Sequence, residues 1–126
     1  MSNGIVLIVD DTKFIRLLAS TALKPLGCTV IEAENGAMAL DLIEEHHPDV
    51  VLLDVVMPEI DGFQTLAHIR STPGMENTQV AMLTTAGMPS DLELGAEMGA
   101  DAYILKPFDN DGLRAKVAEL LELATD

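Results

Sequence analysis

The chain has 126 residues, of which 7 are Lys or Arg and 21 are Asp or Glu, so its formal net charge at neutral pH is −14. A surface this acidic repels the phosphates of nucleic acids and anionic lipids, so we expect neither as a direct partner. The hydrophobic fraction of 48% is enough for the core of one folded domain over residues 1–126.

No apolar run is long enough for a membrane span, and the N-terminus lacks the basic start and the cleavage site of a signal peptide. The only cysteine, Cys28, excludes an internal disulfide and fits a reducing compartment. Together these observations predict a cytoplasmic protein.

The first third of the chain predicts two strands, each followed by a helix. Residues 5–9, IVLIV, form an unbroken apolar run that is typical of a strand buried on both faces. A helix is expected from Thr12, and Pro25 should break its last turn. Its periodic apolar residues are Ile15, Leu18, Ala22 and Leu26. A second strand is expected at residues 29–33, and Asn35 is a good N-cap for the helix after it.

The middle of the chain predicts a buried strand that ends on an acid. Residues 50–53, VVLL, are apolar without alternation, and Asp54 follows them directly. Pro58 should stop this strand, because proline lacks the N–H group that a sheet requires. The pair Asp61-Gly62 is typical of a turn, and the next helix is expected to start at its glycine.

The last third predicts two more strands with their helices. A fourth strand is expected at residues 80–84, and residues 90–93, SDLE, match a capping box that starts a fourth helix. A fifth strand at residues 102–105 is followed by Lys106. Asp109 is expected to cap the final helix.

Five strands that alternate with five helices predict an α/β fold with a doubly wound parallel sheet. The flavodoxin-like strand order 2-1-3-4-5 makes the first and third strands neighbours at the switch point. Right-handed crossovers then place the carboxyl ends of all five strands at one edge of the sheet. Ligands of open α/β sheets bind at this edge.

Polar side chains follow four of the predicted strands at this edge, namely Asp10, Asp11, Asp54, Thr84 and Lys106. Three carboxylates brought together in water-poor surroundings repel one another, and one is driven to hold its proton. A hard divalent cation removes this conflict, and Mg²⁺ prefers carboxylates, waters and phosphate oxygens as ligands. The set therefore predicts a Mg²⁺ site.

The same residues suit an incoming phosphoryl group. The Asp54 carboxylate can act as a nucleophile and form an acyl phosphate. The metal and the Lys106 ammonium can neutralise the phosphoryl oxygens, and the Thr84 hydroxyl can donate to one of them. Each residue alone has an ordinary structural explanation, but their joint placement predicts a phosphoryl-accepting site.

With these residues in view, the sequence resembles the receiver domain of two-component response regulators, closest in layout to the single-domain, CheY-like type. The resemblance covers essentially the whole chain and implies the flavodoxin-like (βα)5 fold with strand order 2-1-3-4-5. Its markers are Asp10-Asp11, Asp54, Met57-Pro58, Asp61-Gly62, Thr84 and Lys106-Pro107-Phe108.

The resemblance implies a role for each site residue. Asp54 would be the phosphoacceptor, and Thr84 and Lys106 would contact the phosphoryl group. The Lys106–Pro107 peptide would be cis, and Tyr103 would be the aromatic switch residue. The Mg²⁺ ligands would be Asp10, Asp11, Asp54 and the backbone carbonyl of Val56.

The resemblance also implies a signalling function. A sensor histidine kinase or a histidine phosphotransfer protein would donate the phosphoryl group, and the face made by the fourth helix, the fifth strand and the fifth helix would change for a downstream protein target. The chain would promote only its own phosphorylation and dephosphorylation, and so would not be an enzyme in the usual sense. Val56 and Ala86 carry no polar group to position water, which predicts slow to moderate dephosphorylation, and Thr85 departs from the small residue usual in the family.

Three other interpretations stay open at this point. Haloacid-dehalogenase-like phosphatases need a second Asp two residues after the nucleophile, where this chain has Val56. A flavodoxin-like cofactor binder is disfavoured by the 3% aromatic content and by the acidic edge of the sheet. The third is a receiver-like interaction module that works without phosphorylation, against which the complete set of acids, threonine and lysine argues.

Overall fold

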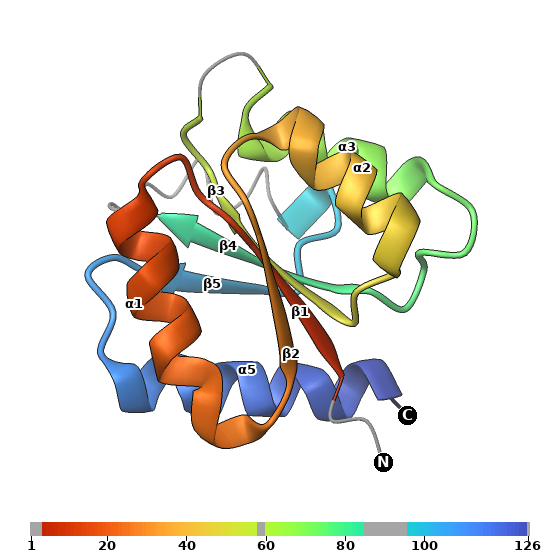
Figure 1. The fold of residues 1–126 in the computed structure, drawn as a ribbon. Helices are drawn as coiled ribbons and strands as arrows, with labels where there is room; N and C mark the ends of the chain where they lie inside the picture. The colour runs from red at the N-terminus through yellow and green to blue at the C-terminus, as the bar shows by residue number, and fades with distance from the viewer. Residues whose placement is uncertain (1–3, 58–59, 85–95, 126) are drawn as a thin grey trace.

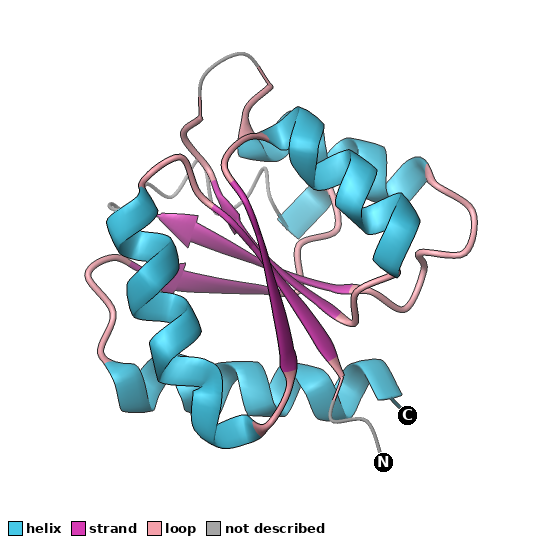
Figure 2. Ribbon diagram, in the orientation of Figure 1, coloured by secondary structure: helices cyan, strands magenta, loops and turns pink. Residues whose placement is uncertain are grey.

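The computed structural model describes residues 4–57, 60–84 and 96–125, and within these ranges the chain forms a single layered α/β unit (Figure 1). The regular elements, coloured by type in Figure 2, are β1 (Ile5–Val9), α1 (Lys13–Leu23), the 3-10 turn η1 (Lys24–Leu26), β2 (Thr29–Ala33), α2 (Gly36–His46), β3 (Val50–Asp54), α3 (Gly62–Ser71), β4 (Gln79–Thr84), β5 (Ala102–Leu105) and α5 (Asn110–Thr125).

The five strands form one parallel sheet in the order β2-β1-β3-β4-β5, as the sequence predicts. Helices α1 and α5 lie against one another on one face of the sheet, and α2 and α3 lie together on the other face (Figure 1). All strand carboxyl ends therefore meet at one edge, and polar residues that follow the strands become neighbours.

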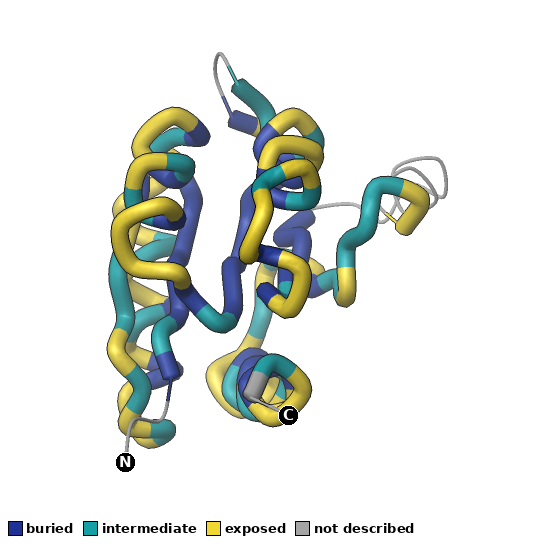
Figure 3. The backbone as a smooth tube through the Cα atoms, turned by 90° about the vertical axis from the view of Figure 1, so that its right-hand side faces the viewer, coloured by how far each residue is buried: buried dark blue, intermediate teal, exposed yellow. Residues whose placement is uncertain are grey.

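The central strand β3 is buried along its whole length. Its side chains alternate between two hydrophobic clusters, with Val50 and Leu52 facing α1 and α5, and Val51 and Leu53 facing α2 and α3. Buried residues gather along the strands and the inner sides of the helices (Figure 3). An unbroken apolar run is therefore the pattern that a strand covered on both faces requires.

Local capping fixes where several helices begin and end. The Asn35 side chain accepts a hydrogen bond of 2.8 Å from the backbone N–H of Met38, which confirms it as the N-cap of α2. Asp109 accepts from the backbone N–H of Gly112 at the start of α5. Pro25 lies in η1, where the helix tightens, and Gly27 ends this turn with a φ of 71°.

The predicted turn at Asp61-Gly62 is the start of α3. The Asp61 side chain accepts from the backbone N–H of Gln64 at 2.9 Å, and the Gln64 side chain accepts from the backbone N–H of Asp61 at 2.9 Å. This reciprocal pair is a capping box, which satisfies two backbone donors at the helix end.

The apolar residues predicted for the first helix do not all face inward. Ala19, Ala22 and Leu23 are buried, but Leu18 is 36% exposed. Helix α1 packs on α5 as well as on the sheet, so its buried stripe includes Ala19, Ala22 and Leu23 but not Leu18.

Several predictions fall outside the described residues, namely those for Pro58, Thr85, Ala86 and the capping box at residues 90–93. Of the predicted fourth helix, residues 96–97 are helical, and Gly99 follows with a φ of 100°. Among the helices of the described residues, none combines the length and the apolar character needed to cross a bilayer.

Gly62 allows α3 to start directly against the end of β3. Its N–H donates to the carbonyl of Val55 at 3.0 Å. A Cβ atom at this position would lie 2.8 Å from the Val55 Cα and 3.0 Å from the carbonyl carbon of Asp54, and closer still to the carbonyl oxygen of Asp54. The close approach therefore requires a glycine and helps to fix the backbone of Asp54.

We expect Gly62→Ala to lower the free energy of unfolding by at least about 2 kcal/mol in urea denaturation, because the new methyl group must displace backbone atoms. The matched control is the opposite exchange at an exposed position of the same helix. Ala67→Gly should cost only about 1 kcal/mol, the difference in helix propensity. A smaller loss for Gly62→Ala than for Ala67→Gly would contradict the close approach.

Candidate functional site

Asp54 is the last residue of β3 and lies almost fully buried, with 6% of its surface exposed. In the sheet it is paired with Leu83 of β4, and the N–H of the following residue, Val55, donates to the Leu83 carbonyl at 3.0 Å. The ladder therefore continues past the carboxylate, so the side chain of Asp54 is held at a rigid strand end.

Asp10 and Asp11 follow β1, the neighbouring strand. Asp10 is fully buried, and its N–H donates at 3.1 Å to the carbonyl of Ala33, the last residue of β2. One carboxylate oxygen of Asp10 accepts from the N–H of Thr12 at 2.8 Å. Asp11 is exposed. The turn between β1 and α1 thus fixes one buried and one exposed carboxylate side by side.

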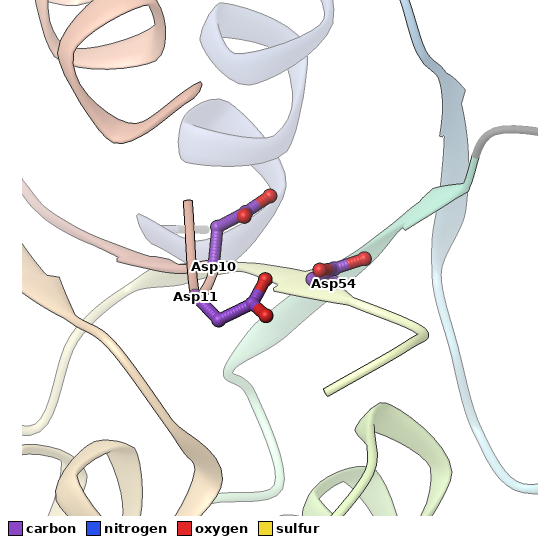
Figure 4. Close-up of side chains that lie close together, drawn as sticks. All are labelled: Asp10, Asp11 and Asp54. Carbon is purple, nitrogen blue, oxygen red and sulfur yellow. The ribbon is translucent and has the colours of Figure 1, made fainter. Parts of the chain in front are cut away.

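The carboxylates of Asp10, Asp11 and Asp54 converge at the carboxyl edge of the sheet (Figure 4). One oxygen from each residue lies within 4.8 Å of the oxygens of the other two. Three hard oxygen donors at this spacing, one of them open to solvent, fit Mg²⁺, which keeps several of its waters in protein sites. The acidic cluster can therefore hold a divalent cation.

Lys106 comes from the end of β5 and reaches this cluster across the sheet edge. Its ammonium lies 2.6 Å from Asp10 Oδ2 and 3.3 Å from Asp54 Oδ1, and its side chain is 12% exposed. The N–H of Lys106 donates to the carbonyl of Thr84 at 2.7 Å, and the peptide from Lys106 to Pro107 is cis. Residues 96 positions apart in the sequence are therefore joined at the site.

The surroundings shift the proton affinity of Asp54. Burial raises the pKa of this carboxyl above its usual value, and the negative charge of Asp10 raises it further, while Lys106 only partly offsets both effects. For Lys106, burial alone would lower the pKa, but the hydrogen bond to Asp10 and the two negative charges outweigh burial and raise it. The lysine is thus held as a cation, and Asp54 is the carboxylate that the cluster destabilises.

The remaining predicted residues lie around this centre. Thr84 ends β4 and is buried beside Asp54's strand, paired in register with Leu105 of β5. Tyr103 lies half-buried on β5, in register with Met82, and packs against the cluster beneath α2 and α3.

Val56 lies two residues after Asp54 and is 75% exposed, and its N–H donates to Asp54 Oδ1 at 3.3 Å. Its side chain therefore projects into solvent at the mouth of the site, where it offers only hydrocarbon.

Sequence reasoning missed Arg16. Its guanidinium donates to the backbone carbonyl of Asp10 at 2.7 Å and pairs with Glu32 at 3.2 Å. Arg16 therefore fastens the β1–α1 turn that carries both acids. The only signal in the sequence was a basic residue four positions after Thr12, where the predicted helix starts.

Comparison with known proteins places this geometry in a family. Residues 6–118 match the response regulator receiver domain. Protein PilG of Pseudomonas aeruginosa is 40% identical over 113 residues, which cover 89% of this chain and 84% of that protein. The structure of the chemotaxis protein CheY4 of Vibrio cholerae superposes with a TM-score of 0.88 at 32% identity, and the match covers 93% of this chain and 98% of CheY4.

Longer relatives carry the same domain as one part. The transcriptional regulatory protein CpxR of Escherichia coli is 40% identical over 116 residues, which cover 92% of this chain and 48% of CpxR. The sheet order, the strand-end acids and these matches agree with one another. The chain belongs to the response regulator receiver domains of two-component signalling and is of the CheY-like type.

Proposed function

We propose that this receiver domain accepts a phosphoryl group on the Asp54 carboxylate, in a Mg²⁺-dependent transfer from a sensor histidine kinase or a histidine phosphotransfer protein. The observation that carries the proposal is the placement of one buried carboxylate, Asp54, 3.3 Å from the Lys106 ammonium and within 4.8 Å of two further acids. A cationic partner and two further metal ligands thus surround the carboxylate of Asp54, which is the proposed nucleophile.

In the proposed transfer, an oxygen of Asp54 attacks the phosphorus of a phosphohistidine. The new O–P bond makes an acyl phosphate, and the N–P bond breaks, so that the donor imidazole leaves and takes a proton from solvent. A Mg²⁺ ion held by Asp10, Asp11, Asp54 and the carbonyl of Val56 would supply positive charge to the phosphoryl oxygens.

The chain itself provides the second cation. Lys106 is pinned to Asp10 at 2.6 Å and is already within 3.3 Å of Asp54. Because its ammonium already lies close to both carboxylates, it can remain paired with Asp10 and also contact a phosphoryl group on Asp54. It would stabilise the charge that develops on the phosphoryl oxygens.

The signal is proposed to leave through the neighbouring strands. Thr84 is drawn toward the phosphoryl group, and Tyr103 shifts in response, which changes the surface of β5 and α5 that a downstream protein binds. Phosphorylation adds roughly −1.5 to −2 charges and shifts the population between two packings. The domain thus catalyses only its own phosphorylation and dephosphorylation, as an intracellular relay.

Of the alternative functions, a module that works without phosphorylation is the second candidate. Such a module would not need the Lys106 ammonium next to the acids. The close ion pairs of Lys106 with Asp10 and Asp54 therefore favour the phosphoryl-accepting function. A dehalogenase-like phosphatase is disfavoured because Val56, at the position of the needed general acid, has no proton to transfer.

The first prediction of the proposed function concerns the phosphoacceptor residue. Incubation with Mg²⁺ and acetyl phosphate should increase the mass of the wild-type chain by one phosphoryl group, and Asp54→Asn should show no increase. The matched control is Asp41→Asn on the exposed side of α2, which should react as the wild type does. Lys106→Met should slow the reaction by about tenfold or more, because the phosphoryl oxygens lose a cation. Equal labelling of Asp54→Asn and wild type would sink the proposal.

The second prediction concerns electrostatics without metal. Because the pKa of Asp54 is raised in the fold, its contribution to stability is present at acidic pH and is lost as the pH rises from about 4 through the raised value. In metal-free buffer at pH 7, Asp54→Asn should therefore melt about 2–5 °C above the wild type. The gain should shrink toward pH 4.

Added Mg²⁺ should raise the melting temperature of the wild type by linkage and should have less effect on Asp54→Asn, which lacks one charged ligand. Asp41→Asn again serves as the control and should follow the wild type with and without the ion. Identical melting of wild type and Asp54→Asn at pH 7, with no response to Mg²⁺, would mean that the carboxylates do not interact as described.

The third prediction concerns the lifetime of the phosphorylated state. The exposed Val56 side chain can neither donate nor accept a hydrogen bond, so it cannot orient an attacking water. Dephosphorylation should be slow to moderate, and Val56→Asn should accelerate it severalfold. A wild-type lifetime of seconds or less, measured by loss of the phosphoryl mass, is the contrary result.

A further inference from the structure

A groove lies between α2 and α3, on the opposite side of the sheet from α1 and α5, with a volume of about 350 Å³. Its floor is apolar and its rim is polar, and its lining residues are Leu40, Ile43, Glu44, His47, His68, Ile69, Thr72, Pro73 and Met75. These residues adjoin the starts of β3 and β4, whereas Asp54 and Thr84 end these strands. The groove is therefore remote from the acidic cluster.

A second depression of about 130 Å³ continues from this groove and shares His47 and Met75 with it. It passes Pro48 and Thr78 and reaches Ala124 near the end of α5. Two joined depressions make an elongated surface, which suits an extended stretch of polypeptide better than one compact small molecule. We call the pair the α2–α3 groove.

Acidic side chains outnumber basic ones on the side of the sheet that holds the groove. Arg70 is the only lysine or arginine between Pro25 and Leu105. Its guanidinium is occupied, since it donates to the carbonyls of Gly99 and Thr78 at 2.9 and 2.8 Å and pairs with Asp101 at 2.6 Å. Glu44 lines the groove, and the other exposed acids nearby in the sequence are Asp41 and Glu45 on the same helix and Glu76 next to the lining residue Met75.

The opposite face of the sheet carries most of the positive charge, on Lys13, Arg16, Lys24, Arg114 and Lys116. Helices α2 and α3 together carry three acids, all of them on α2, and one base, Arg70, whereas α1 and α5 on the opposite face of the sheet (Figure 1) together carry four bases and three acids. Such a separation steers a cationic partner toward the α2–α3 side.

We propose that the α2–α3 groove docks a segment of a partner protein in which an aliphatic or aromatic side chain is flanked by lysine or arginine. The apolar floor made by Ile43, Ile69 and Met75 receives the anchor, and Glu44 at the rim pairs with a flanking cation. Because the groove is remote from Asp54, this docking does not depend on phosphorylation and goes beyond the proposed function.

A second copy of the chain is a poorer occupant. Helix α1 does expose Phe14 and Leu17 beside Lys13, so it has a similar chemistry. A contact between α1 of one copy and the groove of another is heterologous, and it produces open chains rather than a closed assembly unless the rotation closes. Each added copy also brings a net charge of −14, which opposes growth.

The test uses the full chain, labelled with ¹⁵N, in excess Mg²⁺ so that the acidic cluster is neutralised. The probe is a short synthetic peptide of extended conformation in which leucines are flanked by lysines. One matched peptide has glutamate at every lysine position, and another has serine at every leucine position. We expect saturable chemical-shift changes at the groove, around Leu40 and His68, with the leucine–lysine peptide alone.

Two pairs of variants locate the contact. Glu44→Lys should weaken binding of the leucine–lysine peptide about fivefold or more, whereas Glu119→Lys, the same charge change on α5, should leave it within about twofold. Leu40→Ser should weaken binding, and Leu17→Ser on α1 should not. The melting temperature of each variant shows that it is folded before its affinity is interpreted.

Three results would overturn the proposal. Equal binding of the peptide that lacks leucines would show attraction by net charge alone. Shift changes confined to α1 or to the Asp54 edge would place the contact elsewhere. Shift changes at the groove that grow with protein concentration in the absence of peptide would identify a second copy as the occupant. Labelling of Asp54 by acetyl phosphate is measured separately, so the two proposals can fail independently.

Discussion

The ion pair between Lys106 and Asp10 is the interaction on which the rest of the site depends. Asp10 is fully buried, and a buried carboxylate without a partner costs several kcal/mol, about 3–5 when a pair is broken. Lys106, which is distant from Asp10 in the sequence, supplies that partner, with its ammonium 2.6 Å from Asp10 Oδ2. The pair can form only if β1 and β5 end at the same edge, so the charge match and the parallel sheet support one another. Burial and the charge of Asp10 outweigh the effect of the shared Lys106, so the neighbouring Asp54 keeps a raised pKa, and a bound cation would stabilise its charged form.

Rigid support of Asp54 comes from the strand beneath it. Every residue of β3 is buried between two hydrophobic clusters, and the start of α3 is closed against the strand end through Gly62. A carboxylate on such a support moves little, so the packing of the core helps to set the distances from Asp54 to Lys106 and to the other acids. The site can therefore be occupied or modified without a rearrangement of β3 itself.

The two faces of the sheet differ in charge. Both faces bury a hydrophobic cluster, so burial alone does not require the acids of α2 on one face and most of the bases on the other. One exception is structural, since Arg70 ties the end of α3 to the segment before β5. The remaining asymmetry is a property of the surface, where charge acts on partners and on association rates more than on stability.

The sequence by itself determined the strands, the parallel sheet and the placement of the acids, the threonine and the lysine at the strand ends, and the resemblance to a family implied the strand order. Unbroken apolar runs mark strands covered on both faces, and a side chain that follows such a run must lie at the carboxyl edge. It also determined the Asn35 and Asp109 caps, because capping is a local hydrogen bond.

Only the tertiary structure decided which groups touch. Lys106 lies closer to Asp10 than to Asp54, and Arg16 holds the backbone of Asp10. Leu18 is 36% exposed although the apolar period predicts it inside, and β4 begins one residue early at Gln79, whose N–H donates to the carbonyl of Asp49 at 2.9 Å. Periodicity along a chain fixes which side chains share a face, but distances across the sheet depend on how separate elements pack, and no single segment encodes that packing.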